Sequence, residues 1–497
     1  MAIKRYYAEA DNTITNAFQE NLSVRGTGSN MGQADVLETF SIYAQESATS
    51  TELARILLQF PISQIAADKA ADLIPASGVS YYLKMFNARH PHTLPKNYKL
   101  NVLAVSASWE EGNGLDMEGY TDVTFDKIGS NWVKSAGSTS WTTAGGDYHS
   151  SPAYTASFDR GDEDLEVNVT TLVDQWLNGD KQNYGFGIHL SSSFEASSSA
   201  NPGGALFSYY TKKFFARSSE FYFDRPVLEA RWDSTRRDNR GNFYFSSSLA
   251  PAAENLNTLY MYNYIRGNLR DIAGNSAARP VLNLYYSSGS VPEGSPLFFR
   301  NSSNTAVNFL SASRESKGVY KATFSVTGGA VTTTYPYLVD VWTLSGSEVH
   351  TGSVITPLDF SFSNFNPNSK HVVTIKNLKP KYSRGQTERF RLYVREKNWS
   401  PNIFTVAKTT PPNKLIESAS YQICRAPDKK IVIPYGTGST GETMLSYDSD
   451  GNYFDLDMDL LEAGYTYELK FSFYEDSLSS YREQPYNFKI RVEQDEY

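Results

Sequence analysis

Hydrophobic and polar residues alternate over most of this chain, and that alternation predicts β-strands. Leu165 and Val167 alternate with polar neighbours as in a strand, and apolar residues then recur at helical spacing from 169 to 177. A second strand is predicted to follow this short helix, and it contains Gly185 and Gly187. Glycine at both positions predicts the close approach of another backbone or side chain.

The same alternation continues through the second half of the chain. It predicts strands over 243–245, 258–265, 281–286, 318–326, 337–344, 371–378, 388–396 and 415–424. Turn pairs separate several of these segments, for example Gly328-Gly329. Strands at this spacing, joined by hairpin turns, are typical of immunoglobulin-like sandwiches.

The clearest hairpin is predicted over 444–460, with Asp450-Gly451 as its turn. After the turn, apolar residues alternate strictly with Asp455, Asp457 and Asp459, so one face of the strand is acidic. A calcium loop is the less favoured alternative, because the glycine stands at the fourth position instead of the sixth and no glutamate closes a twelve-residue loop. We expect a solvated acidic face, which at a subunit interface would pair with Arg or Lys.

Length and composition predict several β domains. A chain of 497 residues is too long for one core, and an aromatic content of 14% favours β-sandwiches. Polar segments at 231–242 and 345–357 suggest linkers. We therefore predict an all-β protein with a sandwich at 1–235 and two immunoglobulin-like sandwiches at 236–355 and 356–497.

Charge and cysteine content narrow the functional classes. The net charge is −8 without a basic block, so nucleic acid is not an expected partner. The single Cys424 excludes an internal disulfide; it is expected to be a buried strand residue, the alternative being a nucleophile beside a histidine. No signal peptide or membrane-spanning run occurs, which predicts synthesis in a cytosol and no membrane insertion.

No motif predicts catalysis or a cofactor. Glu110-Glu111 and Asp162-Glu163-Asp164 could serve glycoside hydrolysis, but such pairs arise by chance among 54 acidic residues. His90-Pro91-His92 is the one histidine pair, and its surroundings lack the further Cys or acidic ligands of a metal site. We predict no enzymatic activity, no cofactor and no metal.

The segment 105–160 is rich in aromatic residues and glycine, and it supplies the candidate binding residues. Aromatic rings on sandwich loops can stack against the apolar face of a sugar. The alternative is that these rings close the end of the sandwich core, and their exposure distinguishes the two. The candidate carbohydrate-binding residues are Trp109, Trp132, Trp141, Tyr148 and Tyr154.

A succession of motifs over 1–233 resembles the DNRLRE-type β-sandwich domains, relatives of a carbohydrate-binding module family. The resemblance implies a jelly-roll-like sandwich and a strand over 51–60, where the local pattern also fits a helix. One departure is Arg217-Ser218-Ser219-Glu220, where the family reads Ser-Arg-Glu. The motifs are Asp11, Thr13, Ile14 and Gly32; Ala54-Arg55-Ile56-Leu57-Leu58-Gln59-Phe60; Trp109-Glu110-Glu111-Gly112; Trp141 with Gly145-Gly146-Asp147; Val167-Asn168-Val169-Thr170 with Val173, Trp176 and Gly179; Asn183-Tyr184-Gly185-Phe186-Gly187-Ile188; and Pro226-Val227-Leu228-Glu229-Ala230-Arg231-Trp232.

The whole chain resembles virion structural proteins of large tailed phages, marine ones in particular, beginning with the segments 6–16 and 25–32. This resemblance implies a noncatalytic virion component that is assembled in the host cytoplasm and docks on the head, neck, tail or baseplate. The implied partners are other virion proteins and further copies of the chain in a symmetric assembly. The alternative is an adhesion protein that recognises host surface polysaccharide.

Overall fold

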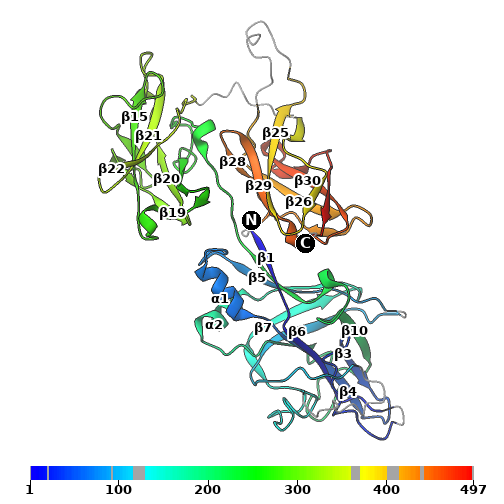
Figure 1. Cartoon of the computed structure of the whole chain (residues 1–497). Helices are drawn as coiled ribbons and strands as arrows, with labels where there is room; N and C mark the ends of the chain where they lie inside the picture. Colours follow the sequence, from blue (N-terminus) through cyan, green and yellow to red (C-terminus); the bar gives the residue numbers. More distant parts are fainter. Residues whose placement is uncertain are drawn as a thin grey trace. The chain divides into compact units, whose positions relative to one another are not determined.

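The computed structural model describes residues 2–19, 22–90, 93–115, 129–359, 370–399, 413–436 and 441–494. The chain divides into an N-terminal unit, Ala2–Trp232, and a C-terminal unit, Asp233–Tyr497 with Met1. Strands dominate both units, and the helices α1 and α2 lie in the N-terminal one (Figure 1). The prediction of an all-β chain of sandwich domains is confirmed.

The N-terminal unit contains a four-stranded and a seven-stranded antiparallel sheet. The four-stranded sheet has the order β1 (Ile3–Tyr7), β11 (Val227–Arg231), β5 (Ser80–Met85) and β8 (Leu165–Asn168). The seven-stranded sheet has the order β10 (Tyr209–Phe215), β3 (Val36–Tyr43), β4 (Thr51–Gln59), β9 (Phe186–Leu190), β6 (Tyr98–Val105) and β7 (Tyr148–Phe158), and β2 (Ala10–Thr15) pairs with β4. The first and last strands of the unit pair with each other, with Ile3 opposite Arg231.

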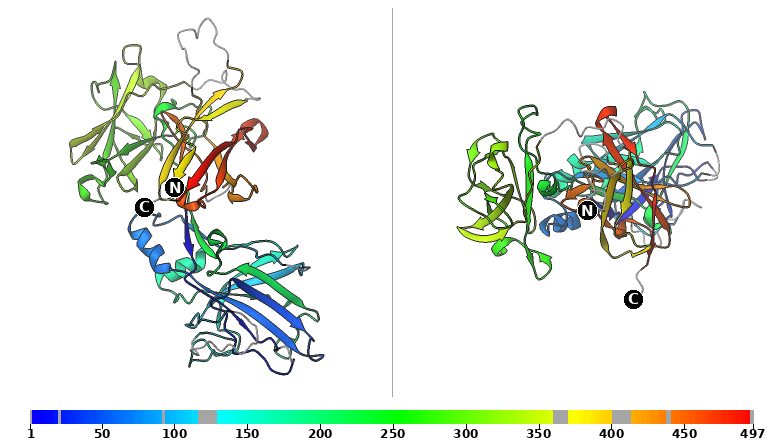
Figure 2. Two further views of the ribbon diagram at one scale, coloured as in Figure 1. Left: turned by 45° about the vertical axis from the view of Figure 1, so that its right-hand side comes forward. Right: turned by 90° about the horizontal axis from the view of Figure 1, so that it is seen from above.

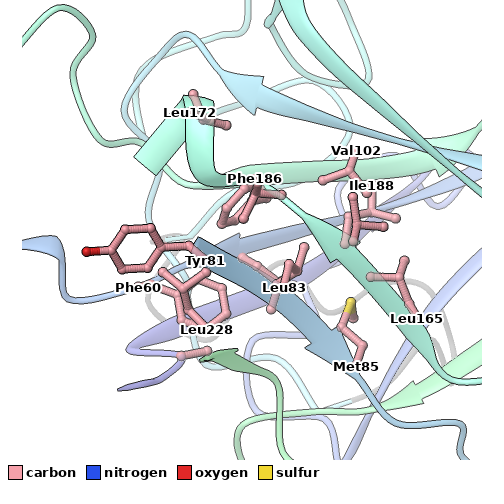
Figure 3. Close-up of a cluster of buried hydrophobic side chains, with 14 of the residues drawn as sticks. Phe60, Tyr81, Leu83, Met85, Val102, Leu165, Leu172, Phe186, Ile188 and Leu228 are labelled. Atoms are coloured by element: carbon pink, nitrogen blue, oxygen red, sulfur yellow. The ribbon is translucent and has the colours of Figure 1, made fainter. Parts of the chain in front are cut away.

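One hydrophobic core fills the space between these two sheets (Figure 3). Both sheets supply it, because alternate side chains of each strand point to the same face. Burial of these side chains is the main favourable term in the folding of the unit. Figure 3 labels Leu83, Met85, Leu165 and Leu228 from the four-stranded sheet and Val102, Phe186 and Ile188 from the seven-stranded sheet.

The two short helices α1 and α2 contact each other at one end of this core (Figure 2). The ambiguous segment after Thr51 is the strand β4, so the strand implied by the resemblance is confirmed, and α1 (Ile62–Ala70) follows it. The predicted helix after β8 is α2 (Thr170–Asn178). It ends at Gly179, whose φ of 79° is left-handed, as expected at a helix C-terminus.

The two glycines around the start of β9 lie in close contact with other parts of the unit. Gly185 has a φ of +81°, and a Cβ there would overlap the carbonyl oxygen of Leu58. A Cβ on Gly187 would overlap the ring of Tyr148. The predicted close approach is therefore confirmed at both positions, against a backbone in one case and a side chain in the other.

Gly185→Ala is expected to destabilise the N-terminal unit by roughly 2 kcal/mol or more, because left-handed strain adds to a clash with a backbone atom that cannot move independently. Gly179→Ala is the matched control. It has a similar φ of +79° and no atom near its Cβ position, so only strain of about 1 kcal/mol is expected. Urea unfolding of the full chain measures both losses, and equal losses would contradict the clash.

The first half of the C-terminal unit forms a sandwich of two antiparallel sheets around a core that includes Phe324 and Trp342. A short hairpin, β13 (Tyr264–Ile265) and β14 (Asn268–Leu269), projects from it. One sheet holds β12 (Asn257–Tyr262), β20 (Val319–Ser325), β16 (Phe299–Asn301), β17 (Ala306–Val307) and β19 (Ser313–Ser316). The other holds β18 (Leu310–Ser311), β15 (Val281–Ser287), β21 (Tyr337–Leu344) and β22 (Ser347–Thr351).

The prediction of a linker over 345–357 is wrong. Residues of this segment form β22, which pairs with β21, and the fully buried Ile355 pairs with Leu338. The polar composition has a structural cause: β22 is an edge strand whose side chains are mostly exposed on both faces. The first predicted boundary, at 235/236, lies three residues after the start of the C-terminal unit at Asp233.

The second half of this unit again has two sheets, with Cys424 buried as predicted. The predicted hairpin is present, but its turn is Ser449-Asp450 because Asp448 lies opposite Gly451, and its second strand ends at Asp457, three residues before the predicted end. One sheet holds β23 (His371–Ile375), β25 (Thr387–Glu396), β29 (Gly451–Asp457) and β28 (Ser446–Asp448). The other holds β24 (Lys381–Ser383), β32 (Phe488–Glu493), β30 (Thr466–Glu475), β26 (Ala419–Arg425) and β27 (Ile431–Ile433), with β31 (Ser480–Glu483) on β30.

Candidate functional site

The predicted carbohydrate-binding rings largely gather in one aromatic cluster on the N-terminal unit. Trp132 and Trp141 pack on Ile14, Leu57 and Val105, and Trp109, Tyr148 and Tyr184 lie at the margin of the cluster. The indole N–H groups are satisfied internally. That of Trp141 donates to the carbonyl oxygen of Asn131 at 2.8 Å, and that of Trp109 donates to the carbonyl oxygen of Tyr184 at 2.8 Å.

Burial separates the five candidates. Trp132 and Trp141 are only 7% and 5% exposed, so neither offers a ring face on which a sugar could stack. Trp109 and Tyr148 are half-buried. Tyr154 lies apart from the cluster: it packs against the core between the sheets, and its hydroxyl accepts the backbone N–H of Leu172 at 3.1 Å. The two buried tryptophans belong to a hydrophobic cluster that is separate from the core between the sheets, so they are neither open to a sugar nor the closure of the sandwich core.

Arg55 organises the polar side of the aromatic cluster. Its guanidinium lies 5.3 Å from the ring centre of Trp132 and donates to Glu195 at 3.0 and 3.2 Å. It also donates to the carbonyl oxygen of Gly145, which accepts the Tyr148 hydroxyl as well. The sequence signal for this network was Arg55 at the start of the apolar run Ile56-Leu57-Leu58 of β4, within one of the motifs that carry the family resemblance.

His189 lies beside the same ion pair. Its Nδ1 is 2.7 Å from the carbonyl oxygen of Leu190 and 3.6 Å from Glu195. Burial, together with the charge of Arg55, lowers the pKa of His189 to about 4. The imidazole is therefore neutral at pH 7, and the carboxylate that could orient it as a base is already neutralised by Arg55. This arrangement stabilises the fold and does not prepare a proton transfer.

A neutral buried histidine makes the N-terminal unit sensitive to acid. The folded-state pKa is below the unfolded value, so the stability is complete above about pH 6.5 and is lost as the pH falls toward 4. Between pH 7 and 4.5 we expect the free energy of unfolding of the wild type to fall by about 2 kcal/mol more than that of His189→Gln. Urea unfolding at both pH values tests this. An NMR titration that places the His189 pKa above 6 would contradict it.

Residues from two of the motifs that carry the family resemblance, and one from the segment that departs from it, meet in a second polar cluster. Arg217 donates to both carboxylate oxygens of Glu111, at 2.9 and 2.6 Å, and Glu111 also accepts the backbone N–H of Asp11 at 2.8 Å. Asp11 is fully buried, and burial raises its pKa to about 7. Arg217, at the departure from the family motif, thus has a structural role.

Asn30 holds the adjoining loops together. Its side-chain amide donates to the carbonyl oxygens of Glu111 and Ser130 at 2.6 and 2.8 Å, and it accepts the N–H of Gly114 at 2.9 Å. A Cβ on Gly112 would overlap this side chain. The glycines of these loops therefore permit backbone packing around Asn30.

The predicted acidic face of the C-terminal hairpin is not a free solvated surface. Asp455 accepts two hydrogen bonds from Arg389, at 2.7 and 3.0 Å, and Asp448 accepts two from Arg391, both at 2.9 Å. Both arginines lie on the neighbouring strand β25. The expectation of a solvated face is therefore correct for the exposed Asp459 and wrong for Asp455, because the pattern of one strand does not reveal what its neighbour carries.

Two kinds of site are absent from the described part of the chain. The described residues contain no group of three or more His, Cys, Asp or Glu side chains that could hold a metal ion. His92, one of the two histidines considered for a metal site, lies outside them. Among the described helices, none has the length and apolarity needed to cross a bilayer.

Comparisons with known proteins give only distant likenesses. No model of a protein family matches the chain, and no curated protein matches it. One matching structure is Dpr2 Ig1-Ig2 in complex with DIP-Theta Ig1-Ig3, at 8% identity and a TM-score of 0.13, with 44% of this chain and 54% of that one covered. Another is trypsin-activated alpha-2-macroglobulin from Escherichia coli, at 9% identity and a TM-score of 0.16, with 82% of this chain and 30% of that one covered. The chain thus spans about half and about a third of the lengths of these two proteins.

Proposed function

We propose that this chain is a noncatalytic structural component of a tailed-phage virion that docks by protein-protein contacts on the head, neck, tail or baseplate. The main support is the outward display of large apolar side chains by the first sandwich of the C-terminal unit. Large exposed apolar side chains gain stability when a partner covers them, so they are suited to protein-protein contacts. The exposed residues are Leu249, Tyr264, Val291, Phe298 and Phe309.

Open sheet edges are a second support for docking. β22 and β31 are edge strands with mostly exposed side chains, and β7 is an eleven-residue edge strand without a charged residue. Edges of this kind can pair with a strand of another chain. In a symmetric particle many such contacts, weak individually, add up to a stable attachment.

The ionisable groups support a noncatalytic role. Among the described residues, three carboxylates that are largely shielded from solvent, Glu195, Glu229 and Asp340, are each paired with an arginine of the same unit. A general acid or base needs a group whose proton is available to a substrate in a cleft. Carboxylates fixed in internal ion pairs do not meet that requirement.

Cross-linking mass spectrometry of purified virions tests this proposal. We expect lysines of this chain to cross-link to other virion proteins and to further copies of the chain. The proposal fails if the protein is missing from purified particles. Its place on the particle follows from the identity of the cross-linked neighbours.

Recognition of host surface polysaccharide is the second candidate function, because Trp109 keeps part of its ring exposed at the loop end of the N-terminal unit. A glycan array with the full chain separates the two candidates. Docking alone predicts no glycan signal. A signal that Trp109→Ala removes would favour the polysaccharide.

A further inference from the structure

A groove of about 550 Å³ lies at the β10 edge of the seven-stranded sheet, away from the aromatic cluster. The loop that follows β2 supplies one wall, and the outer residues of β3, β4 and β10 supply the floor and the other wall. Cross-strand pairing sets the positions, with Ile42 directly opposite Glu52 and Glu38 opposite Lys213. The residues that matter for its chemistry are Phe18, Phe40, Ile42, Glu38, Glu52 and Lys213.

Glu52 has an unusual environment in this groove. Glu52 is only 3% exposed, and one of its carboxylate oxygens accepts the backbone N–H of Phe18 at 2.8 Å. The other oxygen has no hydrogen-bond partner among the described residues. A buried carboxylate oxygen without a partner is costly, so the site favours a ligand that donates to it.

The nearby cations are already engaged. Lys213 is paired with Glu38 at 2.6 Å. Arg25 donates to the carbonyl oxygens of Asn16 and Thr51 at 2.8 Å each, and its guanidinium stacks on Phe18 at 4.1 Å. The described lining of the groove therefore keeps one negative charge, that of Glu52, without an ion-pair partner.

We propose that this groove binds an arginine side chain of a protein partner. The guanidinium would donate to Glu52, and the aliphatic stem would lie on Phe40 and Ile42. Arginine fits better than lysine, because a planar, weakly hydrated cation tolerates an apolar groove and presents several donors. The inference rests on the proposed docking function and names the chemistry that one docking surface recognises.

The test uses the full chain and two small probes, N-acetyl-arginine amide and its neutral isostere N-acetyl-citrulline amide, in saturation-transfer NMR. We expect the arginine probe to bind about fivefold more tightly than the citrulline probe, since only the arginine probe carries a positive charge that can pair with the carboxylate of Glu52. Glu52→Gln should reduce the arginine signal to the citrulline level. Glu46→Gln, an exposed acid outside the groove lining, is the matched control and should leave it unchanged.

A second variant keeps the test decisive if Glu52→Gln unfolds. Ile42→Lys places a cation of the chain itself opposite Glu52 and should abolish binding of the arginine probe. Equal signals for the two probes, or an arginine signal that survives both groove variants, would overturn the proposal. A saturation-transfer signal from methyl glucoside, with none from the arginine probe, would also overturn it. These results do not depend on virions, so failure of the groove and failure of the virion proposal are separately visible.

Discussion

Glu229→Gln is expected to destabilise the N-terminal unit by about 3–5 kcal/mol at pH 7, because it leaves a set of buried cations without their counter-charge. Glu229 is 2% exposed and lies on β11. It accepts a hydrogen bond from Arg5 at 2.7 Å and one from Arg231 at 2.7 Å, and Lys84 lies 3.8 Å away. Glutamine keeps the shape of the side chain and part of the hydrogen bonding but removes the charge.

The pKa of Glu229 gives the expected pH dependence. Burial alone would raise this pKa, but the charges of Lys84, Arg5 and Arg231 outweigh burial and hold it well below the usual range. A carboxyl group with a lowered folded-state pKa stabilises the protein above its unfolded pKa, and the stabilisation is lost as the pH falls below about 4.5. The difference between the wild type and Glu229→Gln should therefore shrink in acid.

Glu166→Gln is the matched control for this substitution. Glu166 pairs with the same Arg231 at 2.7 Å, but its side chain is largely solvated, so we expect a loss below about 1 kcal/mol. Urea unfolding of the full chain, followed by tryptophan fluorescence, measures both variants. If the two variants lose similar amounts of unfolding free energy, Glu229 does not stabilise the surrounding cations more than the solvated Glu166 does.

Asp340→Ala is expected to destabilise the C-terminal unit by a similar amount, about 3–5 kcal/mol. Asp340 is fully buried on β21 and accepts two hydrogen bonds from Arg240, at 2.6 and 2.8 Å. It also accepts the indole N–H of the buried Trp342 at 2.6 Å. Alanine would leave the guanidinium of Arg240 without its counter-charge and the indole N–H of Trp342 without its acceptor.

Glu315→Ala is the control for Asp340→Ala in the same sandwich, because Glu315 pairs with Lys321 on a partly solvated surface. We expect less than about 1 kcal/mol from it. Differential scanning calorimetry of the full chain shows which transition each variant shifts. The interpretation fails if Asp340→Ala and Glu315→Ala lower the same transition equally.

Local features of the fold were predictable because they depend on short stretches of sequence. Alternating residues determine which segments become strands, and the strands after Leu165 and around Asp450-Gly451 are where the pattern places them. Glycine has few reasons to occur in the interior of a sheet, so Gly185 and Gly187 indicated close approach before the neighbouring atoms were known.

The errors share a different cause. The polar segment 345–357 was interpreted as a linker, although it contains an edge strand and the buried Ile355. Trp132 and Trp141 were candidates for sugar binding, although both are buried in a small hydrophobic cluster outside the core between the sheets. Whether a polar strand or an aromatic ring is covered depends on residues far away in the chain, and composition alone does not contain that information.

The sequence by itself determined that this protein is built of β-sandwiches, because side-chain alternation is a property of each strand taken alone. Only the tertiary structure decided which charges meet. Arg5 and Glu229 are 224 residues apart, and Arg240 and Asp340 are 100 apart, and each pair forms because two strands or loops become neighbours on folding. The oxygen of Glu52 that remains without a partner in the groove has the same origin, since the pairing of β3 with β4 placed it there.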